Sequence, residues 1–287
     1  MKKLIILAFV IIAASAASAG LLDALKGDFG PGTKTGETKT LILPGGATME
    51  MIYVAPGSLM MGSPSSEDGR RDDETQHRVT LTKGFWLAKY EVTQVQWQSV
   101  MGSNQSKFLG GNLPVENVSW DDCQKFIKKI NTQLSCGARL PSEAEWEYAC
   151  RAGSTTVFSC GNALNHDMAN VSMFFPYGTT DKGKKLGVVG TASVGSYAAN
   201  AWGFCDMHGN VWEWCDDWYG QYPTDSVTDP LGSASGVKRV LRGGWWNGHA
   251  RYSRSAIRGG SKPSLRDDTF GFRLCCSAQT NNEETIK

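Results

Sequence analysis

The residues with the clearest chemical potential are the eight cysteines and four histidines of this 287-residue chain. The cysteines contain no CxxC motif, which structural zinc sites generally use, so we do not expect zinc. His77, His166, His208 and His249 lack HxxxH and HExxH spacing, so no histidine-based metal centre is expected either. An even number of cysteines instead favours disulfides in an oxidising compartment.

Aromatic and basic residues are concentrated between Gly243 and Arg258, in the stretch GGWWNGHARYSRSAIR. Adjacent Trp, His, Arg and Tyr side chains can provide rigid contact area and charge-assisted hydrogen bonds. We therefore predict a ligand-binding surface, made by Trp245, Trp246, Asn247, His249, Arg251, Tyr252, Ser253 and Arg254. The alternative is that the tryptophans belong to the core. Neighbours on a strand point to opposite faces, so both should not enter one core, whereas Trp212 and Trp214 share a face that we expect to be buried.

The N-terminal residues have the order of a signal peptide. Lys2 and Lys3 precede an apolar run, and Ala17-Ser18-Ala19 is a small-residue cleavage site. We expect residues 1–19 to be removed and the chain to be exported, to the periplasm or beyond the cell. No second apolar run is long enough to span a membrane. With 29 basic and 28 acidic residues, the composition gives no bulk attraction to nucleic acid.

The elements that would hold these residues are short. Strands are predicted over 49–55, 57–61, 77–81 and 84–89. Helices are predicted after Thr93, Ser119 and Ser142, because each is followed three residues later by Gln, Asp or Glu, which completes a capping box. We interpret residues 20–47 as a linker or loose arm, 63–74 as a solvated loop, 48–278 as one domain and 279–287 as a flexible tail. Thirty-three glycines and ten tryptophans indicate a turn-rich fold with large rings in its core.

Five segments in order closely resemble the formylglycine-generating enzyme, or sulfatase-modifying factor, family. They are GFWLAKYEVTQVQWQ from Gly84, RLPSEAEWEYACRAG from Arg139, WGFCDMHGNVWEWCDDWYG from Trp202, RVLRGGWWNGHARYSRSAIR from Arg239 and GFRLC from Gly271. The resemblance implies a single α+β domain, a variant of the C-type-lectin fold with little regular secondary structure. Its active members oxidise a sulfatase cysteine to formylglycine, using oxygen and copper(I) held by two cysteines.

The copper ligands that the resemblance implies are missing from this chain. The first family cysteine falls on Gly248, and the second falls on Ala250 or Ser253. Copper(I) is soft and prefers sulfur ligands, and no cysteine lies between Cys215 and Cys275. We therefore expect no copper and assign no catalytic residue.

The resemblance also implies calcium sites. One would use the carboxylates of Asp206 and Glu213 with the main-chain carbonyls of Gly209 and Val211, a donor set that suits a hard cation. The alternative is that Asp206 and Glu213 are only turn and cap residues. A second site would begin at Asn170 and Val171, but Leu186 stands where an acidic ligand is expected, with Asp181 as a substitute.

The family's disulfides supply one further expectation. They join the second helix to the strand after GFR, and here Cys123 and Cys276 each lie about 6 Å from the family positions on the same faces. The resemblance therefore implies a Cys123–Cys276 bridge. Cys150 matches another half-cystine, whose partner position is Ser255.

Three functions remain in view. The first is an exported, calcium-stabilised module that binds a peptide, protein or glycan without catalysis. The second is a formylglycine-generating-type oxidoreductase that acts on a protein cysteine through an unrecognised metal site. The third is a ligand-display variable protein of a diversity-generating retroelement, some of which use this fold.

Overall fold

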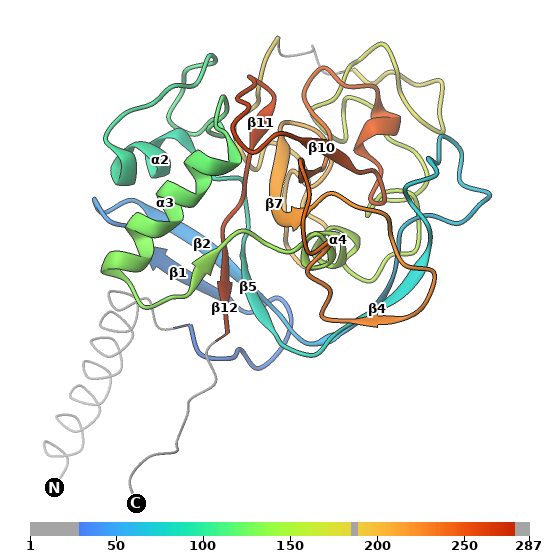
Figure 1. Ribbon diagram of the computed structural model, residues 1–287. Helices are drawn as coiled ribbons and strands as arrows, with labels where there is room; N and C mark the ends of the chain where they lie inside the picture. The colour runs from blue at the N-terminus through green and yellow to red at the C-terminus, as the bar shows by residue number, and fades with distance from the viewer. Residues whose placement is uncertain (1–28, 185–188, 279–287) are drawn as a thin grey trace, which may run out of the picture.

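The computed structural model describes residues 29–184 and 189–278 (Figure 1). The expected signal peptide and the C-terminal tail from residue 279 lie outside the described residues. Within the two described ranges, no helix combines the length and the apolar character needed to cross a bilayer.

A five-stranded antiparallel sheet forms the centre of the domain, in the order β1-β2-β5-β12-β6. Its strands are β1 (Thr38–Ile42), β2 (Thr48–Val54), β5 (Phe85–Ala88), β12 (Cys275–Ser277) and β6 (Ala138–Arg139). Successive side chains of a strand point to opposite faces. Trp86 accordingly enters one hydrophobic cluster and Leu87 the other, so the sheet is buried on both sides.

Two helices cover one face of this sheet, as Figure 1 shows for α3 in front of β1 and β2. They are α2 (Gln94–Met101) and α3 (Trp120–Gln133), and both begin with the predicted capping boxes at Thr93 and Ser119. Trp97 of α2 stacks on Phe126 of α3, with ring centroids 5.2 Å apart. The expected ring-rich core is therefore present under the helices.

The opposite face packs against α4 (Glu143–Arg151), whose capping box at Ser142 was also predicted. A three-stranded sheet lies beyond it, in the order β3-β4-β8. Its strands are β3 (Gly57–Met61), β4 (His77–Leu81) and β8 (Val227–Thr228). The four strands predicted between residues 49 and 89 are thus confirmed to within a residue or two at each end.

A third sheet positions the residues that carry chemistry, in the order β10-β9-β7-β11. Its strands are β7 (Trp212–Trp218), β9 (Arg239–Arg242), β10 (Gly259–Ser261) and β11 (Phe270–Gly271), and the 3-10 helix η1 (Ala250–Ser253) lies between β9 and β10. Trp214 is completely buried and Trp212 packs against the same cluster, as the shared face predicted.

Two expectations about the N-terminal half are wrong. Residues 38–47 are not a linker, because β1 pairs with β2 along its whole length and Leu41 is buried. Phe29 is buried against Trp86, so the folded domain begins well before residue 48. The polar stretch 63–74 is not simply solvated either, because Glu74 is completely buried.

The structure does not contain the Cys123–Cys276 bridge, and each of the eight cysteines is a free thiol. Cys276 instead neighbours Cys136. Its side chain forms a hydrogen bond with the Cys136 thiol and thereby lowers the pKa of that thiol. Cys136 lies two residues before Ala138, which pairs with Cys276 between β6 and β12. Cys123 faces the same hydrophobic cluster from α3, but its sulfur is not bonded to Cys276.

Candidate ligand-binding site

Five ring systems form a continuous row, which we call the aromatic row. Phe175 stacks on His249 with centroids 3.7 Å apart, and His249 lies 5.8 Å from Tyr252. Tyr252 stacks on Trp245 at 5.9 Å, and Trp245 stacks on Trp212 at 5.7 Å. Phe175 is 49% exposed, and the other four rings are half-buried. Three of the four contacts are near-parallel stacks, and His249 and Tyr252 are tilted by 41°. A row of partly exposed rings offers flat apolar area of the kind that binding surfaces use.

Main-chain hydrogen bonds bring the segments of this row together. Ser172 N donates to Gly248 O, and Ala250 N donates to Phe175 O. These bonds hold residues 172–175 against η1, although the two segments are separated by more than seventy positions. No sequence pattern indicates that Phe175 belongs to this site, or that Phe174, which is 64% exposed, lies next to it.

Polar side chains border the aromatic row. Asn247 and Arg251 are exposed, and the Arg251 guanidinium lies 5.0 Å from the Tyr252 ring centre while donating to the Tyr252 hydroxyl. Trp246 instead packs edge-on against Phe108, with ring centroids 5.4 Å apart. The six predicted residues from Trp245 to Tyr252 are therefore at the surface, five of them in or beside the row.

Two predicted binding residues are not at this surface. Arg254 is completely buried, and its guanidinium donates to both carboxylate oxygens of Glu74 and to Glu67. Ser253 is also completely buried, and its hydroxyl lies beside Gly244. Both side chains point inward because η1 turns the chain at this point, so they support the surface from below.

The positions of the family's copper ligands do not fit copper. A Cβ at Gly248 would lie 2.8 Å from Cε3 of Trp245, so the indole fills the space into which a cysteine would project. Ser253 offers only a hard hydroxyl, and no cysteine lies nearby in the sequence. Within the described ranges, no group of three His, Cys, Asp or Glu side chains is arranged to hold a metal.

A buried cysteine and histidine do lie together, at Cys150 and His208. The Cys150 sulfur is 3.9 Å from His208 Nε2, which also accepts hydrogen bonds from the amide and hydroxyl of Ser159. Burial raises the pKa of the Cys150 thiol to about 12 and lowers the pKa of His208 to about 4. Both groups are therefore neutral at physiological pH, and the pair lacks the thiolate needed for nucleophilic chemistry.

The proposed calcium loop has the tight geometry that was expected. Asp206, Gly209 and Asn210 adopt φ values of +59°, +93° and +64°. Gly209 is required there, because a Cβ would lie 2.3 Å from the carbonyl oxygen of Asn170. Asn210 N donates to that same carbonyl, so the first expected calcium site, at 206–213, lies beside residues 170–171 of the second.

Glu213 is committed to other partners. Its two oxygens accept hydrogen bonds from Arg273 at 2.6 and 2.7 Å, and one also accepts from Trp146 Nε1 at 2.8 Å. Because the guanidinium already neutralises this carboxylate, Glu213 does not fit the role of a calcium ligand. Val211 and Val171 are both buried, and the Val171 carbonyl is hydrogen-bonded to His166 Nδ1 at 2.7 Å.

Asp206 belongs to this loop and Glu91 accepts a hydrogen bond from its Asn210, and neither acid forms an ion pair with a described residue. Burial, and then the Asp206 carboxylate, raises the pKa of Glu91 well above its ordinary value. Burial raises the pKa of Asp206 to about 6, although its Oδ2 accepts a hydrogen bond from Gly195 N. Among the residues that the structure describes, Glu91 Oε2 and Asn170 Oδ1 are buried oxygens without a hydrogen-bond partner. Unsatisfied buried oxygens of this kind are compatible with a hard cation.

The fold and the site together define a C-type-lectin-like α+β domain with a partly exposed aromatic row and no cysteine between Cys215 and Cys275. The sequence matches the family described as "Sulfatase-modifying factor enzyme 1-like domain" over residues 41–278. The chain therefore belongs to the sulfatase-modifying factor, or formylglycine-generating enzyme, family.

Similar proteins in this family differ in function. The serine/threonine-protein kinase pkn1 of Chlamydia caviae is 32% identical over 83% of this chain, and the match spans only 39% of the kinase. The formylglycine-generating enzyme of Streptomyces coelicolor is 34% identical over 81% of this chain and 68% of the enzyme. Among solved structures, Treponema denticola variable protein 1 has a TM-score of 0.72 and 29% identity, covering 84% of this chain and 99% of that one.

Proposed function

We propose that this protein is an exported binding module that uses the aromatic row to hold a peptide, protein or glycan and does not perform copper-dependent formylglycine formation. The observation that carries the proposal is the Trp245 indole, which occupies the space of a thiolate at Gly248. The same indole is the centre of the aromatic row, stacked between Trp212 and Tyr252. One side chain thus removes the family's metal site and contributes to the binding surface.

Loss of the oxidase activity is tested with copper. The reduced, purified protein is titrated with copper(I) and then incubated with oxygen and a peptide that carries a sulfatase cysteine motif. We expect no stoichiometric copper binding and no formylglycine in the mass spectrum. Formation of formylglycine would instead establish the alternative, an oxidoreductase with a metal site of a different kind.

The binding surface is tested with arrays of oligosaccharides and peptides. A Trp245→Ala variant removes a ring from the middle of the row. A Leu109→Ala variant serves as a control, because Leu109 is an apolar residue that is 75% exposed and is not part of the row. We expect hits on the wild-type protein to be lost with Trp245→Ala and kept with Leu109→Ala. Equal binding by the three proteins would place the ligand elsewhere.

Calcium belongs to this proposal with a smaller donor set than the family implies. Support comes from Asp206 and Glu91, whose buried carboxyl groups share one nearby guanidinium, that of Arg273, with Glu213. Asn170 supplies a further oxygen, while Glu213 is excluded by its ion pair. We expect calcium to raise the unfolding temperature of the chelator-treated protein and to have a much smaller effect on an Asp206→Asn variant.

A display function is the second candidate. The likeness to Treponema denticola variable protein 1 supports it, as does the exposure of Asn247 and Arg251 beside the row. Sequencing the locus decides this candidate. A nearby template repeat and reverse transcriptase, with variation confined to exposed positions of 245–252, would favour display over a fixed ligand.

A further inference from the structure

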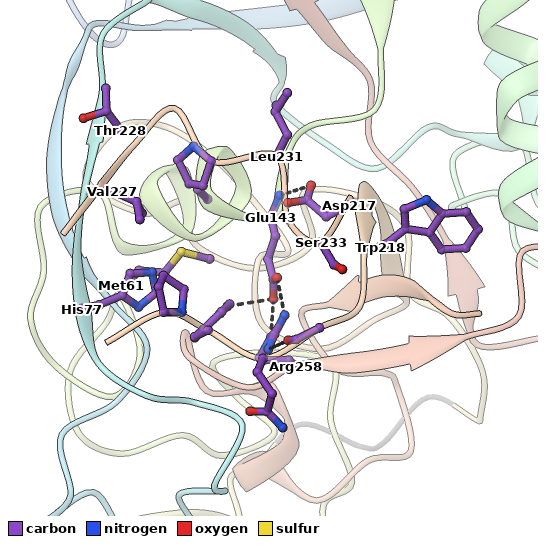
Figure 2. A pocket seen from close by; sticks show the side chains of 17 residues that line it. Met61, His77, Glu143, Asp217, Trp218, Val227, Thr228, Leu231, Ser233 and Arg258 are labelled. Atoms are coloured by element: carbon purple, nitrogen blue, oxygen red, sulfur yellow. Dashed lines mark hydrogen bonds and ion pairs between the residues drawn. The ribbon is translucent and has the colours of Figure 1, made fainter. Parts of the chain in front are cut away.

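A cavity of about 380 Å³ is lined by residues other than those of the aromatic row (Figure 2). Its walls come from β3, β4, β8, the first turn of α4, the end of β7 and the loop that follows β7. The volume falls in the range of small-molecule sites. Apolar wall is supplied by Met61, Tyr222, Pro223, Val227, Pro230 and Leu231.

The floor of this cavity is a rigid ion-pair network centred on Glu143. Its carboxylate accepts hydrogen bonds from Arg242 at 2.9 Å, from Arg258 at 2.6 and 2.7 Å, and from the Tyr222 hydroxyl at 2.8 Å. All of these side chains are fixed by the fold, and Glu143 is fully neutralised by two guanidinium groups. Glu143 therefore has no remaining capacity to attract a charged ligand.

Asp217 differs from Glu143 in this respect. It is only 4% exposed, and its Oδ2 accepts a hydrogen bond from Glu143 N at 2.8 Å. In the part of the chain that the structure describes, its Oδ1 has no hydrogen-bond partner and neither oxygen has an ion-pair partner. Gly232 passes beside this atom with φ +73°, and a Cβ there would lie 2.9 Å from Oδ1. Because Gly232 has no side chain, no Cβ crowds Asp217 Oδ1 at this point.

The groups that line the cavity indicate what kind of ligand could pair with the Asp217 carboxyl group. Burying a carboxyl without a cation is costly, and the cost falls when a positively charged donor approaches. Burial and the neighbouring Glu143 carboxylate raise the pKa of Asp217 to about 8, so without a ligand the carboxyl group holds a proton at neutral pH, and a bound ammonium group would displace that proton. In Figure 2, Asp217 and Ser233 lie on one side of Glu143, and Met61, His77 and Val227 lie on the other. A ligand that spans the hollow therefore meets an acid at one end and apolar surface at the other.

We propose that this cavity binds a small primary amine with an apolar body, its ammonium group donating to Asp217 Oδ1 and its body packing against Met61, Tyr222 and Val227. This site is independent of the aromatic row, with which it shares no residue. A side-chain or terminal amine of a peptide has the same chemistry as a free amine, and both sources would use the same carboxylate.

The test uses isothermal titration calorimetry of the full chain with phenethylamine and with its neutral isostere 2-phenylethanol. We expect phenethylamine to bind with a dissociation constant of about 1 mM or tighter, and the alcohol to bind at least about tenfold more weakly. Asp217→Asn should weaken amine binding by about tenfold or more, because it removes a charge-assisted hydrogen bond. Asp72→Asn, the same substitution at a fully exposed carboxylate, should leave binding unchanged.

The proposal is overturned if phenethylamine at about 10 mM shows no binding to the wild-type protein. It is also overturned if 2-phenylethanol binds as tightly as phenethylamine, or if Asp217→Asn binds phenethylamine as tightly as the wild-type protein does. Should Asp217→Asn fail to fold, Ser233→Phe provides a second route. Ser233 is an exposed residue beside the acid, so the added ring should close the cavity without disturbing the floor. Amine binding must then fall, and unchanged binding by that folded variant would also overturn the proposal.

Discussion

The indole of Trp245 lies where a side chain at position 248 would have to project, with Cε3 2.8 Å from the Cβ that Gly248 lacks. Trp245 and Gly248, which lie in one short loop, therefore compete for the same space. A thiolate at 248 would require the ring to leave, and the ring's present position requires a glycine. The stacking of Trp245 in the aromatic row therefore leaves no room for a side chain at position 248.

Adding a methyl group at position 248 should therefore destabilise the protein. We expect Gly248→Ala to lower the free energy of unfolding by about 1–3 kcal/mol, because the new Cβ must displace a packed ring. Gly30→Ala is the matched control, since its Cβ meets no atom within 4 Å. Urea unfolding measures both. In the Trp245→Ala background the cost at 248 should largely disappear, and strictly additive effects would show that the contact with Trp245 is not its cause.

Arg254 should be far more sensitive than Arg251, although they are three residues apart. Arg254→Met leaves the buried carboxylates of Glu74 and Glu67 without their cation, so we expect a loss of about 3–5 kcal/mol. Arg251→Met alters only an exposed side chain and should change stability by less than about 0.5 kcal/mol. Chemical denaturation distinguishes the two. Similar losses in both variants would contradict the burial assigned to Arg254.

Asp217 should make stability fall as the pH rises. Its ordinary pKa of 3.8 is raised to about 8 by burial and by Glu143, so between these values the native state keeps a proton that the unfolded state has released. The stabilisation is complete below about pH 4 and is lost progressively up to about pH 8. Unfolding free energies of wild type and Asp217→Asn are compared at pH 5 and pH 8. The variant should show a shallower decline, whereas parallel pH profiles would be inconsistent with a proton held by Asp217.

Oxidation should link Cys136 to Cys276. These two side chains interact directly, whereas Cys123 faces the same cluster as a separate free thiol. After incubation with oxidised glutathione, peptide mapping should find the 136–276 bridge and reduced Cys123. A Cys276→Ser variant should leave Cys136 reduced. Recovery of a 123–276 peptide would instead restore the bridge that the family resemblance implies.

The helices could be predicted because their signals are local. Each capping box joins residues three positions apart, such as Ser142 and Glu145. Its two hydrogen bonds involve only these near neighbours and need no partner from a distant segment. The strands near the N-terminus followed from alternation for the same reason. β1 was missed because the polar residues beside it obscure the burial of Leu41.

The site was only partly predictable, since its decisive contacts join distant segments. The aromatic positions from Trp245 to Tyr252 followed from residue type, but the stacking of Phe175 on His249 depends on a crossing of loops. The inward turn of Arg254 depends on Glu74, which is 180 positions away. No short-range pattern in the sequence specifies either contact.

The sequence by itself determined the family, the capped helices and the absence of sulfur at the copper positions, since each rests on residue identity or on bonds between near neighbours. Only the tertiary structure decided that Arg273 neutralises Glu213, that Trp245 fills the space beside Gly248, and that Asp217 borders a cavity. Ion pairs and ring packing form between whichever surfaces the folded chain brings within a few ångströms, and sequence separation does not encode that distance.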